Sequence, residues 1–133
     1  MKQRRQRTLG IILRRASIKE SKQRHEAALK EFVRIADRAG EGRTLVRLSR
    51  VEQRLRRPDR ALAHAVRALE TARKKHDYVT EAEALVELGE IWSGEPVAGM
   101  QNLPNPEVAQ RHLRAAREIF KDAGDRGAGA SVL

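Results

Sequence analysis

Hydrophobic positions recur at helical spacing in the middle of the chain. Between residues 41 and 56 the apolar residues stand three or four positions apart, which predicts an amphipathic helix that ends before Pro58. Asp59 is a candidate N-cap for a second helix with a face of small residues, which allows close packing. The pattern predicts a helical hairpin closed at residues 76–78, with Leu45, Leu48, Val51 and Leu55 in its first helix and Ala61, Ala65, Ala68 and Ala72 in its second.

The same plan recurs on both sides of this hairpin. Towards the C-terminus, the pattern predicts a first helix around residues 84–92 and a second from about residue 107 to residue 123, ended by Gly124. Towards the N-terminus, it predicts a helix near residues 4–16 and another from about residue 19 to residue 39, ended by Gly40. We therefore expect three helix pairs in units of approximately residues 1–40, 41–78 and 79–126.

The pairs Leu9-Gly10, Leu48-Ser49 and Leu88-Gly89 mark a regular period, because they follow one another at intervals of 39 and 40 residues. A period of this size indicates stacked supersecondary units. Residues 127–133 match the start of a further first helix or form a tail, and no polar helix covers the last unit. We expect the chain either to belong to a longer regulator or to cover this end by self-association.

Composition agrees with an all-α fold. Of the 133 residues 40% are hydrophobic but only 3% are aromatic, and Ala and Leu supply much of the apolar content. The absence of cysteine excludes disulfides and thiolate chemistry and fits a reducing, cytoplasmic location. No stretch approaches the roughly 20 apolar residues that cross a bilayer, so no membrane partner is expected.

The repeated residues resemble the tetratricopeptide repeat (TPR) family. The resemblance is carried by Leu45, Leu48 and Ser49, by Leu85, Leu88, Gly89 and Trp92, and by the alanines of the second helices. The long period and residues 115–126 are similar to repeats of bacterial transcriptional regulators and signal-transduction ATPases. This resemblance implies a right-handed α-solenoid that binds proteins within a bacterial regulatory system. Glu52 departs from the family, which prefers a large apolar residue at that place.

The sequence gives no sign of an enzyme, a metal site or a cofactor. The four histidines lack the spacing of a zinc site, and no glycine-rich phosphate loop is present. Paired carboxylates such as Glu87 and Glu90 are expected to be solvated charges on a polar helix face. We therefore expect a non-catalytic binding module without catalytic residues, cofactor or metal.

The charge of the chain favours an anionic partner. Its net charge is +10, and Arg forms paired contacts with carboxylates and phosphates. In the family that the chain resembles, the first helices line a concave groove, and its ligand-facing positions carry over to basic and polar residues here. An acidic peptide or protein is the expected partner, and the candidate partner-binding residues are Arg7, Arg14, Arg15, Arg50, Gln53, Arg54 and Met100.

The same register also predicts intramolecular pairing. Arg43, Arg47 and Arg50 precede Glu83, Glu87 and Glu90 by 40 residues each, so three ion pairs could join the two helices. Arg14, Arg15 and Arg54 have no matched acid in this register. These three arginines are therefore the first candidates for ligand contact.

The long loop at residues 94–106 interrupts the third unit. It contains three prolines and the apolar residues Val97, Met100 and Leu103, which either form a functional loop or fold back on Trp92. Trp92 itself is expected in the core. Two alternatives to peptide binding stay open: the basic N-terminal helix and residues 56–57 could bind nucleic acid, or the C-terminal end could self-associate.

Overall fold

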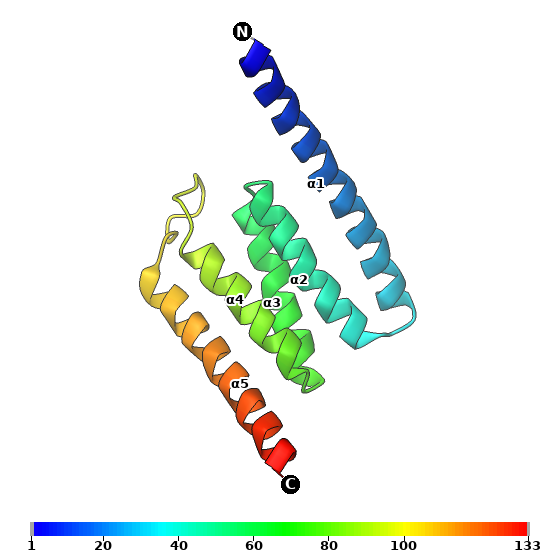
Figure 1. Ribbon diagram of the computed structural model, residues 1–133, viewed down its shortest axis with the longest axis vertical. Coiled ribbons are helices and arrows are strands. Elements are labelled where there is room, and N and C mark those ends of the chain that lie inside the picture. The colour runs from blue at the N-terminus through cyan, green and yellow to red at the C-terminus, as the bar shows by residue number, and fades with distance from the viewer. Residues whose placement is uncertain (1, 133) are drawn as a thin grey trace.

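The protein is all-helical, as predicted. The computed structural model describes residues 2–132, with side chains over residues 4–124, and no β-strand forms in that range. Five helices follow one another along the chain: α1 (Lys2–Arg34), α2 (Arg38–Arg54), α3 (Pro58–Lys74), α4 (Tyr78–Trp92) and α5 (Pro106–Val132). Each helix packs against the next, and α2 also contacts α4. Figure 1 shows α1 at one edge of the array and α5 at the other.

Three helix-to-helix turns share one conformation. Ala36, Arg56 and His76 have positive φ values of 58°, 58° and 54°, and they follow one another at intervals of 20 residues. In each turn the next residue donates its N–H to a carbonyl five residues earlier, as in a Schellman motif. The left-handed position is usually glycine, since other residues cost about 1–2 kcal/mol there. The sequence therefore carries little sign of where these helices end.

Two of the following helices begin with the same cap. Asp37 accepts a hydrogen bond from the backbone N–H of Gly40, and Asp77 accepts one from Thr80, 40 residues further along. The predicted N-cap Asp59 is wrong, because α3 begins at Pro58 and has Arg57 as its cap without a side-chain bond. Proline at the first helical position has no N–H that would need a cap.

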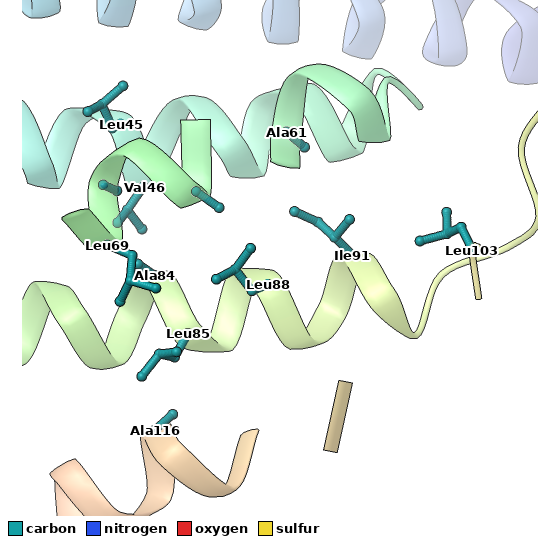
Figure 2. Close-up of a cluster of buried hydrophobic side chains, with 12 residues drawn as sticks. Leu45, Val46, Ala61, Leu69, Ala84, Leu85, Leu88, Ile91, Leu103 and Ala116 are labelled. Atoms are coloured by element: carbon teal, nitrogen blue, oxygen red, sulfur yellow. The ribbon is translucent and has the colours of Figure 1, made fainter. Parts of the chain in front are cut away.

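The core lies between α2, α3, α4 and the start of α5. Figure 2 shows Leu85 directed from α4 towards Ala116 of α5, with Leu88 and Ile91 on the opposite side of α4. Small residues bring the helices close together. The Ser49 hydroxyl donates to the Ala61 carbonyl at 2.9 Å, and Gly89 leaves room for the Leu113 side chain. The pairs Leu48-Ser49 and Leu88-Gly89 thus mark two equivalent helix contacts.

The predicted helix pair of the first unit is wrong. α1 is one helix of 33 residues from Lys2 to Arg34, because nothing between the two expected segments breaks it. Gly40 and Gly124 do not end helices either. Gly40 lies buried in the first turn of α2 against Phe32, and Gly124 lies inside α5. The side chains of residues 127–133, on which the expected further helix and its exposed end rest, lie outside the described ones.

The first half of α1 extends past the rest of the protein (Figure 1). We call the segment of residues 4–18 the overhang. Among the described helices, α1 packs only against α2, and four large apolar side chains of the overhang are 56–67% exposed: Leu9, Ile11, Ile12 and Leu13. The first copy of the Leu-Gly pattern therefore has no partner helix within the described chain.

Candidate functional site: a basic notch

The overhang and the end of α2 enclose a basic notch. The notch is a hollow of about 410 Å³ between two helices that meet only over the second half of α1. Its floor is apolar and its walls carry four guanidinium groups. It is lined by Ile11, Arg14, Arg15 and Ile18 of α1 and by Arg54, Leu55 and Arg56 at the end of α2.

The arginines of the notch are available for an outside ligand. Arg14, Arg15, Arg54 and Arg56 are exposed, and none of them takes part in an ion pair within residues 4–124. No acidic side chain of the described chain lines the notch. The three arginines that the sequence selected first are thus brought together, although α1 and α2 meet here in a way that the sequence did not predict.

The basic surface continues from the notch along the overhang. A second hollow, of about 520 Å³, is lined by Gln6, Arg7, Gly10, Ile11 and Arg14. Arg14 and Ile11 line both hollows, so the two form one surface. Arg7 therefore lies about two helical turns from Arg14 on the same side of α1.

Arg50 and Gln53 are committed to an internal carboxylate. The Glu87 side chain is buried, and its two oxygens accept hydrogen bonds from Arg50 Nε and from Gln53 Nε2, each at 2.6 Å. The hydrogen bond to Glu87 raises the pKa of Arg50, against the opposing effect of burial. These two candidates thus join α2 to α4, and the ligand-contact prediction for them stays untested.

The predicted ion-pair ladder is wrong in its register. Arg50 pairs with Glu87 instead of Glu90, which is a shift of about one helical turn. Arg43 and Arg47 form no ion pair within the described side chains. Glu90 is left without a hydrogen-bonded cation there, and burial, followed by the nearby Glu87, raises its pKa.

The long loop folds back on the core. Leu103 is buried, Met100 is half-buried against the core cluster, and the Asn105 N–H donates to the Trp92 carbonyl at 2.8 Å. Trp92 packs against the same cluster, as expected. The partner-binding role predicted for Met100 therefore lacks the free side chain that it requires, because packing against the core holds Met100.

A hollow between this loop and the ends of α2 and α4 has mixed charge. Its volume is about 350 Å³, and Arg56 lines it together with Gln53, Glu90 and Glu95. The two carboxylates make it less suited to an anion than the notch. The anion-binding surface therefore lies on the α1 side of α2.

Buried glutamates are the polar residues that the sequence did not reveal. Glu41, Glu52 and Glu87 are 3%, 0% and 2% exposed, and each one connects two helices. Glu41 accepts hydrogen bonds from Arg38 and, across to α3, from Arg67. The expectation that Glu87 is solvated is wrong. The apolar residues that flank these glutamates at helical spacing were the available signal, since they place the glutamates near the core.

Glu52 is the most enclosed of the three. Lys22 of α1 places its ammonium nitrogen 2.7 Å from Glu52 Oε1 and 3.7 Å from Glu26. The angles of the Lys22–Glu52 contact are not those of a hydrogen bond, so both Glu52 oxygens lack a hydrogen-bond donor among the described residues. Lys22 is thus the cation that balances a buried charge where the resembled family has an apolar residue.

Comparisons with known proteins assign no family to the chain. A scan against protein-family models finds no match, and a search of the curated proteins finds no similar sequence. Within the described residues, no group of three or more side chains could hold a metal ion, and no helix has the length and apolar character needed to span a bilayer. What the chain binds is inferred from its own geometry and charge.

Proposed function

We propose that this chain is a non-catalytic, TPR-like protein-interaction module that binds an acidic segment of a partner protein in the basic notch. The observation that carries the proposal is the convergence of Arg14, Arg15, Arg54 and Arg56 around an apolar floor with no acid lining it. Guanidinium groups bind carboxylates through paired, charge-assisted hydrogen bonds. The apolar floor adds affinity for Leu or Ile side chains placed between the carboxylates.

A right-handed α-solenoid is the arrangement that we propose for the helices. Its support is the repetition of one turn conformation every 20 residues and of one Asp cap after 40 residues. The contacts between Ser49 and Ala61 and between Gly89 and Leu113 recur with the same 40-residue spacing in their first members. Repeat arrays of this kind present extended surfaces that bind other proteins, within bacterial regulators in the families that the chain resembles.

The test is the binding of a short Glu/Leu peptide, with a Gln/Leu peptide as the uncharged ligand. We expect the triple variant R14Q/R15Q/R54Q to bind the acidic peptide at least tenfold more weakly, which is a loss of about 1.4 kcal/mol or more. The matched control is R111Q/R114Q/R117Q on α5, which removes the same charge from a remote exposed face. Far-ultraviolet circular dichroism should be the same for all three proteins.

Two results would contradict the proposal. Equal losses in the two triple variants would show that net charge alone attracts the peptide. Tighter binding of random-sequence DNA, with the steep salt dependence of counterion release, would favour phosphate recognition instead. The notch has no aromatic side chain on which bases could stack, so we expect the peptide to bind better.

A further inference from the structure

The overhang has an apolar face that points away from the rest of the chain. Leu9, Ile12, Leu13 and Ala16 follow the i, i+3, i+4, i+7 spacing of one helix face. The residues that α1 turns towards α2, such as Ile18 and His25, lie on the opposite side of the helix. The apolar face is therefore uncovered, and it is separate from the notch.

The repeat register shows what covers this face in the other two units. Leu9, Ile12, Leu13 and Ala16 correspond to Leu48, Val51, Glu52 and Leu55 of α2, all of which are less than 9% exposed. In α4 the corresponding Leu88 and Ile91 are also buried. There the next helix of the chain lies alongside, as the hydrogen bond from Ser49 to Ala61 of α3 shows. The missing element is thus a helix that plays the part of α3.

The chain contains such a helix but holds it out of reach. Residues 18–34 correspond to α3, since their half-buried positions Ser21, His25, Ala28, Leu29 and Phe32 precede five buried residues of α3 by 40. Those residues of α3 are Ala61, Ala65, Ala68, Leu69 and Ala72. Because α1 continues straight through residues 15–18, the overhang cannot fold back on the second half of its own helix.

We propose that a second copy of this chain supplies the missing helix. Two α1 helices pair antiparallel, so that the overhang of each copy lies along residues 18–34 of the other. This is the exchange of an identical element between protomers, with a helix that continues where each monomer would otherwise turn. The two contacts are equivalent by two-fold symmetry and leave the notch, on the other side of α1, open.

Charge favours the antiparallel pairing. Residues 4–19 contain six basic residues and no acid, whereas the three carboxylates of α1, Glu20, Glu26 and Glu31, all lie in its second half and are exposed. Antiparallel pairing places the basic half of each copy against the half that carries the carboxylates. Parallel pairing would place two basic halves together and is repulsive. This difference also sets the direction of the pair.

The first test is the mass of the protein in solution by light scattering. The wild type should have about twice the 15.0 kDa of one chain, and the variant I12D/L13D should have the mass of a single chain. Val79→Asp is the matched control, because Val79 is 60% exposed on α4, much as Ile12 and Leu13 are on α1, and it should stay dimeric. A wild type that stays monomeric at all concentrations, or an I12D/L13D variant that stays dimeric, would overturn the proposal.

The second test locates the contact. In the antiparallel register, Ala16 lies next to the two-fold axis, so its two copies face each other. The chain has no cysteine, and Ala16→Cys should therefore form a disulfide-linked dimer on mild oxidation, whereas Val79→Cys should not. Equal cross-linking of the two variants would show random collision. A dimer without the Ala16→Cys link would place the interface elsewhere, for example at the C-terminal end, or in the opposite direction.

Discussion

Lys22 balances the buried carboxylate of Glu52, and its removal should be among the most destabilising changes on α1. The Glu52 side chain is 0% exposed, and the Lys22 ammonium lies 2.7 Å from its Oε1. Lys22→Ala leaves this charge buried without its cation, which costs about 3–5 kcal/mol. Since domains of this size have a total stability of about 5–15 kcal/mol, the loss is a large share of it. The expected fall in Tm is roughly 4 °C per kcal/mol.

Urea unfolding followed by circular dichroism measures this loss. Lys30→Ala is the control, because Lys30 is exposed on the same helix and forms no ion pair among the described residues; it should change stability by less than about 0.5 kcal/mol. The double variant K22M/E52L replaces both charges by apolar groups and should recover most of the loss. A Lys22→Ala protein as stable as the control, or a double variant as unstable as Lys22→Ala, would refute the reasoning.

Three further changes test the turns, the close contacts and the buried histidine. His76→Gly should stabilise the protein by about 1 kcal/mol or less, because glycine relieves the positive φ of 54°; a loss on thermal unfolding would contradict this. Gly40→Ala should destabilise it by about 1–3 kcal/mol in urea, because the new Cβ meets the Phe32 ring, although alanine favours the helix; a gain would show that the ring moves freely. Burial lowers the pKa of His64, so the unfolded chain binds its proton first and stability should fall as the pH drops through about 6.5. His64→Gln should flatten this fall in Tm between pH 7 and pH 5, and an unchanged slope would exclude His64 as its cause.

The helical elements could be predicted because their packing surfaces have a strong period. Leu45, Leu48 and Val51 repeat at helical spacing and are all buried, and the alanines of α3 allow the close contact that they suggested. The turn at residues 76–78 could be placed because the apolar pattern lapses there and Asp77 caps the next helix. These features depend only on neighbours along one helix.

The continuity of α1 could not be predicted from the repeat. The period placed a turn near residue 17, where the other units have Arg56 and the long loop, and nothing in the local sequence excludes either conformation. The left-handed positions Ala36, Arg56 and His76 carry no glycine, so the pattern searched for helix ends at Gly40 and Gly124 instead. Tertiary packing overrides the local signal at these positions.

The candidate site could be predicted in part. Matching charges in the repeat register selected Arg14, Arg15 and Arg54 as unpaired, and the structure places all three around one notch. Arg56 was missed as a ligand residue because it was assigned to a turn. The pairing of Arg50 with Glu87 could not be found, since a shift of one helical turn between α2 and α4 depends on packing and leaves the sequence spacing unchanged.

The most direct test of the central claim is an NMR titration with the acidic Glu/Leu peptide that follows the Arg side-chain Nε–H signals at about 0.15 M ionic strength. We predict saturable shifts of the Arg14, Arg15, Arg54 and Arg56 signals, with those of Arg111, Arg114 and Arg117 on α5 nearly unchanged. Shifts of similar size on both sets, without saturation, would contradict a defined notch. They would show that the peptide responds only to the net charge of +10.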